Sequence, residues 1–175
     1  LKVGLRFTIN RHNYVEVPKL FDLLEELEVP RICFYHLVYA GRGSEMVKED
    51  LDHGQTREVV HQIMDRTRDL FDRGLEKEVL TVDNHADGPL VWLRLLKEDP
   101  ARAEEVLKLL SWNEGNSTGR GIGCISWDGS VHPDQFWRNH TLGNVLERPF
   151  SEIWTDESNE FLMRLKDKRP HVGGR

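Results

Sequence analysis

Hydrophobic and polar residues alternate strictly over residues 2–10, KVGLRFTIN. One side of this segment is apolar and the other is not: Val3, Leu5, Phe7 and Ile9 against Gly4, Arg6 and Thr8. A period of two residues is typical of a strand with one buried face. We therefore predict a strand whose apolar side packs on helices.

Two segments further along repeat their apolar residues at helical spacing. The stripes are Leu20, Phe21, Leu24 and Leu27, then Val59, Val60, Ile63, Met64, Leu70 and Phe71. Pro18 fits the first turn of the first helix, Pro30 follows its end, and Gly74 fits the residue just past the second. A third helical stretch, 89–110, is interrupted at Asp99-Pro100, which predicts an N-cap followed by proline at the first helical position.

Between these helices, residues 31–40 (RICFYHLVYA) are apolar on both faces, as in a buried parallel strand, and residues 78–84 (EVLTVDN) predict a third strand. Residues 41–55 predict a polar loop. Strand and helix thus alternate three times, and connections of this length require parallel pairing. The prediction is an α/β fold class with a β/α body over residues 1–110.

The pattern changes after Leu110. Residues 111–123 form a link rich in Gly, Asn and Ser, and Asp128-Gly129 lies between two short apolar runs, which predicts a two-residue hairpin. A final helix is predicted from Ser151, its expected N-cap, to near Arg169. Its apolar positions are Ile153, Trp154, Phe161, Leu162 and Leu165. A small hairpin-plus-helix unit is therefore expected over residues 119–175.

Composition excludes several classes of protein. The 175 residues are 38% hydrophobic and 31% charged, with a net charge of −6. This argues against disorder and against a general binder of nucleic acid or anionic membrane. No apolar run is long enough to span a bilayer, and the N-terminus does not resemble a signal peptide. Two cysteines make a disulfide scaffold improbable and a reduced, cytoplasmic setting the default. Because the chain opens at Leu1 and stops at Arg175, we expect a segment of a longer protein.

Functional groups in parallel β/α sheets collect where the strands end. The three predicted strand ends offer Arg6, Thr8 and Asn10, then Tyr39, Gly41 and Arg42, then Asp83, Asn84 and His85. An Arg6 facing into a barrel-like sheet would need an anionic partner or several hydrogen-bond acceptors. That partner is either a ligand or a structural carboxylate such as Asp83.

Two further clusters leave alternatives open. Asp83, His85 and Asp87 could bind a metal or transfer protons, or could simply turn the chain into a helix. In the hairpin, His132 and Asp134 flank Pro133 beside three aromatic residues, Trp127, Phe136 and Trp137. This is compatible with an oxygen/nitrogen metal site, an aromatic contact surface, or a small core around the two Trp rings.

Several motifs resemble one known family. They are LRFTINRHN, FYHLVYAGRG, DNHADG and, above all, SWDGSVHPDQFW followed by LGNVLERPFSEIWTD. Together they resemble the radical S-adenosylmethionine (SAM) enzymes of heme d1 and alternative heme synthesis. The pattern G-x-V-x-P, then L-G-N-V, then E-I-W resembles the SPASM/twitch extension, which carries an auxiliary iron–sulfur cluster.

The resemblance implies the second half of a partial (β/α)₆ radical SAM barrel followed by an incomplete SPASM/twitch-like extension. It implies SAM and [4Fe–4S] clusters as cofactors, a reduced electron donor protein, and a tetrapyrrole substrate of the didecarboxysiroheme type that is modified at its propionates. By position, it assigns SAM contacts to Thr8, Asn10 and Arg11, and substrate carboxylates to Arg6, His36, Tyr39 and Arg42. Asp134 stands where many relatives have a cysteine, which makes it a candidate ligand of the auxiliary cluster.

The chain also departs from the family. It has no CxxxCxxC loop, no glycine-rich SAM motif after the second strand and no C-terminal cysteine cluster. We therefore predict no catalytic residue in this chain and no activity for it alone, and we expect the first strand to have one edge without a partner. Two alternatives stay open: a metal-dependent hydrolase using Asp83, His85, His132 and Asp134, and a non-catalytic module that docks a partner on the Trp-rich hairpin.

Overall fold

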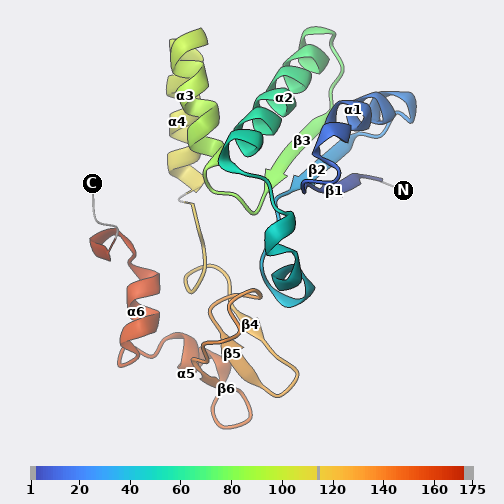
Figure 1. The fold of residues 1–175 in the computed structure, drawn as a ribbon. Coiled ribbons are helices and arrows are strands. Elements are labelled where there is room, and N and C mark those ends of the chain that lie inside the picture. Colours follow the sequence, from blue (N-terminus) through green and yellow to red (C-terminus); the bar gives the residue numbers. More distant parts are fainter. Residues whose placement is uncertain (1–2, 114, 172–175) are drawn as a thin grey trace. The chain divides into compact units, whose positions relative to one another are not determined.

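The computed structural model describes residues 3–113 and 115–171. The chain divides into two compact units, residues 1–113 and 114–175, and each is described here by itself (Figure 1). No helix in the described residues is long and apolar enough to cross a membrane.

The first unit is built on a three-stranded parallel sheet in the order β1-β2-β3. β1 spans Leu5–Thr8, β2 spans Arg31–Tyr35 and β3 spans Glu78–Val82. The predicted parallel β/α arrangement is confirmed. In the described part of the chain, β1 pairs only with β2, so one of its edges has no partner, as predicted.

Helices connect and follow the strands of this unit. They are η1 (Tyr14–Glu16), α1 (Val17–Glu26), η2 (Gly41–Glu49), α2 (His53–Asp72), α3 (Asp87–Glu98) and α4 (Pro100–Asn113). Pro18 lies in the first turn of α1. Asp99 caps α4 as predicted, because its carboxylate accepts the Arg102 N–H at 3.1 Å. A capping box between Asp52 and Gln55 begins α2.

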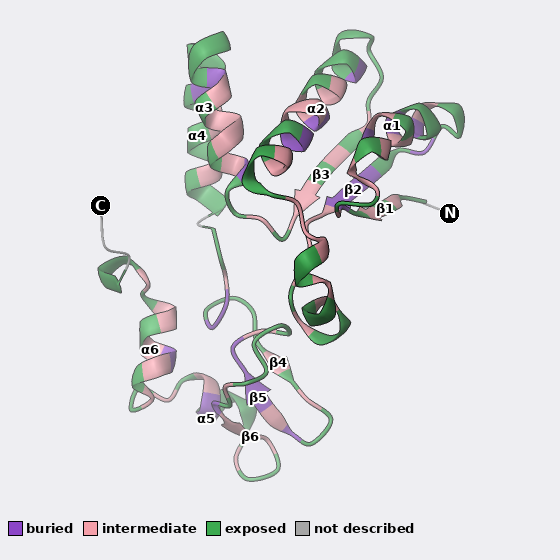
Figure 2. Cartoon of the chain, viewed as in Figure 1, coloured by how far each residue is buried: buried purple, intermediate pink, exposed green. Residues whose placement is uncertain are grey.

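The core of the first unit lies between one face of the sheet and helices α1 and α2 (Figure 2). Its buried members are Ile9, Val17, Phe21, Leu24, Val29, Ile32, Phe34, Val59, Ile63 and Leu70. Phe21 of α1 stacks on Phe34 of β2 with ring centroids 5.6 Å apart. Two residues predicted on the buried stripes, Leu27 and Phe71, are exposed instead. Leu27 lies just past the end of α1. Phe71 lines a cavity, and the Arg102 guanidinium lies over its ring.

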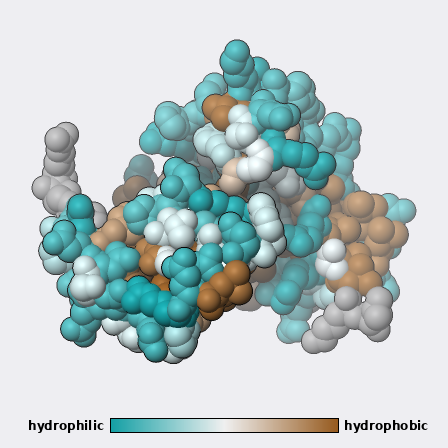
Figure 3. Space-filling view, turned by 90° about the horizontal axis from the view of Figure 1, so that it is seen from below, coloured by the Kyte–Doolittle hydropathy of each residue, from teal (hydrophilic) through white to brown (hydrophobic). Residues whose placement is uncertain are grey.

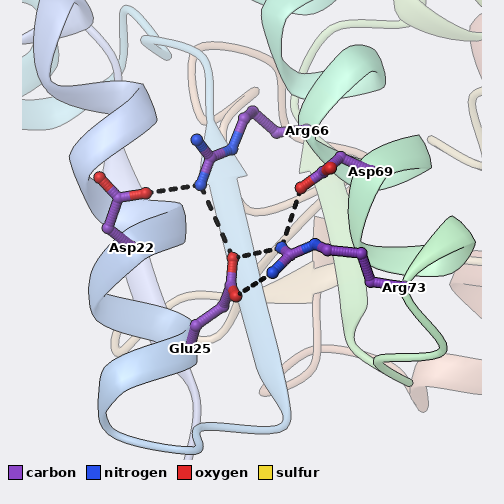
Figure 4. Close-up of polar contacts among 5 residues, drawn as sticks. All are labelled: Asp22, Glu25, Arg66, Asp69 and Arg73. Carbon is purple, nitrogen blue, oxygen red and sulfur yellow. Dashed lines mark hydrogen bonds and ion pairs between the residues drawn. The ribbon is translucent and has the colours of Figure 1, made fainter.

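An ion-pair network joins the exposed sides of α1 and α2 (Figure 4). Arg73 forms a two-pronged contact with Glu25 at 2.7 and 2.8 Å and also pairs with Asp69. Arg66 lies 2.6 Å from Asp22. The hydrogen bond from Arg73 lowers the pKa of the Glu25 carboxyl. Because exposed pairs are screened by solvent, the network contributes little to stability.

The second predicted strand is shorter than expected. β2 ends at Tyr35, and residues 36–40 continue without regular structure. The predicted polar loop after it begins with η2, a 3-10 helix without buried residues. Gly41, with φ of 57°, turns the chain there, and the Ser44 hydroxyl donates to the Gly41 carbonyl at 2.7 Å.

The second unit has an antiparallel sheet of three very short strands, β4 (Cys124–Ile125), β5 (Ser130–His132) and β6 (Gly143–Asn144). The first hairpin is present, but its turn is not the predicted two-residue type. The Ser126 N–H donates to the Ser130 carbonyl, the Gly129 N–H donates to the Ser126 carbonyl, and Gly129 has a positive φ whereas Asp128 does not. This pattern is a three-residue loop with a glycine bulge.

The predicted final helix is two helices, α5 (Phe150–Trp154) and α6 (Glu160–Lys166), followed by η3 (Arg169–His171). Pro149, not Ser151, occupies the N-cap position of α5. The chain turns between the helices because Asp156 accepts hydrogen bonds from the N–H and hydroxyl of Ser158. Asn159 then caps α6 by accepting the Leu162 N–H. The small core of this unit consists of Val131, Leu142, Ile153 and Leu162.

Candidate functional site

The three parallel strands end level with one another. Beyond the ladders, the Ile9 N–H donates to the Tyr35 carbonyl at 2.8 Å, and the His36 N–H donates to the Val82 carbonyl at 3.0 Å. The loops that follow the strands therefore start from one edge of the sheet, which we call the strand-end edge. In parallel sheets this edge is where ligands bind.

Arg6 lies on the sheet face opposite the core. Its side chain is exposed, donates to the Tyr35 hydroxyl at 2.7 Å and stacks on the Tyr35 ring at 4.6 Å. The alternative of a buried Arg6 held by Asp83 is therefore wrong. Thr8, two residues along on the same face, is also exposed.

The loop after β1 is ordered by side-chain amides. Asn13 donates to the Thr8 carbonyl and accepts the Asn10 N–H, while Asn10 accepts the His12 N–H. The Arg11 N–H donates to the Glu49 carbonyl at 2.9 Å, which ties this loop to the end of η2. The amide of Asn10 is thus used within the loop, whereas the Arg11 side chain is exposed.

The loop after β2 carries Tyr39 and Arg42, both exposed. The Tyr39 hydroxyl donates a hydrogen bond to the Asp50 carboxylate. This bond is the main cause of the raised pKa of Tyr39, and partial desolvation of the hydroxyl is the second. A ligand carboxylate can accept the same phenolic proton.

The loop after β3 returns to the β2 loop through a buried pair. His36 Nε2 lies 2.8 Å from Asp87 Oδ2. Asp83, at the end of β3, has a φ of 71°, and partial burial raises its pKa while nearby His36 and His85 lower it. The turn interpretation of this segment is confirmed, because Asn84 accepts the Ala86 N–H and the Asp87 N–H.

Asp134, the predicted cluster ligand of the second unit, organises its own loop. One carboxylate oxygen accepts the N–H groups of Phe136 and Trp137 at 2.7 and 2.9 Å, and the other accepts the Thr118 hydroxyl at 2.5 Å. His132 is buried, with hydrogen-bonding contacts to the His140 carbonyl and the Ser126 hydroxyl. The structure gives both residues structural contacts, and the ligand role of Asp134 stays a prediction.

The aromatic residues of the hairpin do not form a core around two Trp rings, as one alternative proposed. Trp127 is 90% exposed at the hairpin tip. Trp137 instead packs edge-on against Phe161, with ring centroids 5.3 Å apart.

Sequence reasoning missed the contacts that join distant segments. Lys168 donates to the carbonyls of Asn116 and Thr118 at 2.8 Å. Burial and the charge of Arg120 lower the pKa of its ammonium group. His36 and Asp87 are 51 positions apart. No local motif relates residues at such separations, so only the fold reveals these pairs.

The described residues do not contain a metal centre. No group of three His, Cys, Asp or Glu side chains is arranged there to hold an ion. Cys33 is buried in β2 of the first unit, and Cys124 lies in β4 of the second. An iron–sulfur cluster is normally held by four cysteines. The two cysteines of this chain are too few to complete one.

A cavity of about 400 Å³ lies elsewhere in the first unit, between α2, β3, α3 and α4. Its walls are mainly apolar, including Ile63, Val79 and Leu95, and none of the predicted site residues lines it. The strand-end edge is therefore the better candidate site.

Comparison with known proteins agrees with the sequence motifs. Residues 118–172 match the SPASM family, an iron–sulfur cluster-binding domain. The chain is 62% identical over 172 residues to the Fe-coproporphyrin III synthase of Methanosarcina barkeri and 38% identical over 176 residues to the pre-heme d1 synthase of Dinoroseobacter shibae. These alignments cover 98% and 99% of the chain but 43% of each relative. Over nearly its whole length the chain is therefore similar to part of each of these two synthases, and its residues 118–172 match the SPASM domain.

Proposed function

We propose that this chain is part of a radical SAM enzyme that modifies the carboxylate-bearing side chains of a tetrapyrrole during heme synthesis. The observation that carries the proposal is the 62% identity to an Fe-coproporphyrin III synthase over 98% of the chain. The lower identity to a pre-heme d1 synthase makes heme d1 synthesis the second candidate. The enzyme would act in the cytoplasm with a reduced electron donor protein.

The sheet supports the proposal that this chain supplies the second half of a partial (β/α)₆ barrel. α1 and α2 cover one face, while the opposite face carries exposed Arg6 and Thr8, and the described part of β1 has one unpaired edge. In a barrel, helices lie outside and the other face lines the interior. Additional strands from the rest of the protein would place Arg6 inside the barrel.

The strand-end edge offers donors suited to a substrate with several carboxylates. Arg6, Tyr39 and Arg42 would bind propionates, because guanidinium groups match carboxylates in geometry and charge. Tyr39 would exchange Asp50 for a substrate carboxylate. Thr8, Asn10 and Arg11 would contact SAM at the end of β1. In this proposal the chain binds and orients, and the cysteines that hold the clusters come from outside it.

The test uses the full-length protein, reconstituted anaerobically with iron and sulfide and supplied with SAM, a reductant and a didecarboxysiroheme-type substrate. We expect an iron–sulfur absorption band, 5′-deoxyadenosine, and a product with the mass of Fe-coproporphyrin III. Absence of the absorption band and of SAM cleavage would refute the proposal. A product with the mass of pre-heme d1 would instead favour the second candidate.

Two matched variants test the substrate edge in the same assay. Arg6→Ala removes an exposed guanidinium at the proposed site and should raise KM about tenfold or more, by loss of one charge-assisted hydrogen bond. Arg57→Ala removes an exposed guanidinium from α2 and should leave KM unchanged. Equal effects of the two substitutions would count against substrate binding at this edge.

A further inference from the structure

A buried imidazole–carboxylate pair spans the gap between two loops of the strand-end edge. The His36 and Asp87 side chains are only 12% and 7% exposed. A buried carboxylate is costly unless it is paired, so the 2.8 Å contact is the arrangement that this burial requires. The pair therefore sets a fixed distance between the beginning of the β2 loop and the beginning of α3.

Backbone hydrogen bonds anchor both partners of the pair. The His36 N–H extends the sheet by donating to the Val82 carbonyl, and the Asp87 N–H donates to the Asn84 carbonyl. Asp87 is also the first residue of α3, where the helix dipole favours a negative charge. Each side chain thus projects from a backbone that is already held, which makes the contact a rigid link.

A second imidazole–carboxylate pair at the same edge provides a contrast. His12 and Glu49 join the β1 loop to the end of η2, but their side chains are 69% and 35% exposed. Exposed pairs of this kind contribute little, because water and salt screen them. Burial therefore distinguishes the His36–Asp87 pair from its neighbour.

The groups that face His36 come from two elements. Asp87 contacts it from α3, and Asp83 interacts with it electrostatically from the end of β3, where His85 also acts on Asp83. No metal-binding group of three side chains is present in the described parts of the chain, so these residues do not form an ion site. Asp83 also holds a left-handed backbone conformation, which costs free energy and persists only where the surrounding structure holds it.

We propose that His36 and Asp87 are a positioning pair for substrate binding. The pair fixes the spacing between the β2 loop, which carries Tyr39 and Arg42, and the β3 loop, which carries Asp83. It acts through these loops and does not itself contact the substrate, so His36 takes this role in place of the direct substrate contact that the resemblance implies. The proposal rests on the proposed function for the identity of the ligand and adds residues that shape its site.

The first measurement is the affinity of the full-length protein for the didecarboxysiroheme-type substrate, obtained by absorbance titration well below the melting temperature. Asp87→Asn should weaken binding about tenfold, the scale of a lost interaction with a charged group. If Asp87 acts through His36, adding Asp87→Asn to His36→Asn should weaken binding no further. The matched control Glu49→Gln should leave affinity unchanged.

The second measurement needs no ligand. Loosening of the β3 loop in Asp87→Asn should expose Asp83 to water and lower its pKa toward the ordinary value, as followed by carbon-13 NMR of the carboxyl group. Glu49→Gln should not change this titration.

Unchanged affinity in Asp87→Asn, or fully additive effects of the two substitutions, would overturn the proposal. So would a wild-type Asp83 titration in Asp87→Asn. If the wild-type protein fails to bind the didecarboxysiroheme-type substrate while the Asp83 titration moves as expected, the proposed function fails and the ordering of the edge by the pair stands.

Discussion

Different kinds of contact stabilise the interior of each of the two units. The first buries a continuous set of apolar residues between a parallel sheet and two long helices, with Phe21 and Phe34 stacked at its centre. The second has four buried apolar residues and strands of two or three residues. Its shape depends on side chains that bond to the backbone, such as Asp134 and Asn159, and on glycines at crowded positions. Removing one group should therefore have different consequences in the two units.

The largest effect is expected in the core of the first unit. Phe34→Ala removes a fully buried ring and should lower the free energy of unfolding by about 3–5 kcal/mol. Hydrogen exchange, read for each unit separately, should show the loss in residues 1–113. Phe71→Ala is the control, because that ring is 69% exposed and its loss should cost far less. Similar losses for both would contradict a core centred on the sheet.

Gly129→Ala should produce the largest effect in the second unit. Gly129 has a φ of 84°, and an added Cβ would lie 2.4 Å from the Asn144 side-chain oxygen. Strain and crowding together should cost about 2–4 kcal/mol, measured by hydrogen exchange in residues 115–171. Gly74→Ala has a similar φ of 71° but open space around it, so it should cost only about 1 kcal/mol. If the two substitutions lower stability equally, crowding at Gly129 does not contribute to its effect.

Two substitutions of Asp134 distinguish a structural role of its carboxylate from a metal-binding role. Asp134→Ala removes the acceptor of three hydrogen bonds and should lower the stability of the second unit by about 1–2 kcal/mol in thermal unfolding. Asp134→Asn keeps an oxygen for the two backbone N–H groups and should lose much less. If Asp134→Asn leaves stability intact but depletes iron from the reconstituted full-length protein, the carboxylate is a cluster ligand.

The smallest effect concerns the turn between α5 and α6. Hydrogen bonds from Ser158 and then from Arg148 lower the pKa of Asp156 from 3.8 to about 2. Because the folded value is the lower one, the ionised carboxylate stabilises the second unit above about pH 4, and this contribution disappears as the pH falls toward 2. Asp156→Asn should flatten the pH dependence of the melting midpoint in this range. An unchanged slope would show that other carboxylates cause it.

The same contrast explains what could be predicted from the sequence. Burial follows the period of a strand or helix, so the β1 alternation and the α2 stripe identified elements of the first unit. The lengths of the connections predicted parallel pairing, and the half-barrel implied by the family resemblance predicted the free edge. The prediction of one final helix was wrong because the helical spacing of apolar residues continues on both sides of Asp156 and Asn159. The Asp156 side chain starts a turn there, and the Asn159 side chain caps a new helix. Such local hydrogen bonds leave no periodic signal.

The candidate site was predicted in part for a related reason. Strand ends can be located from a pattern, which placed Arg6, Tyr39 and Arg42 near one edge. Their partners could not be found in this way. Tyr35 under Arg6 and Asp87 beside His36 are neighbours only after the sheet and α3 have formed.

The bare margin of β1 has a practical consequence for handling the polypeptide by itself. A strand without a neighbour presents unused amide and carbonyl groups that can recruit another copy. Apolar areas also interrupt the hydrophilic surface of the molecule (Figure 3), and Val3 and Leu80 are among the exposed apolar side chains of the first unit. The net charge of −6 opposes such association at low salt. Raising the ionic strength during purification should therefore promote aggregation, and low-salt buffers at low protein concentration should keep the chain in solution.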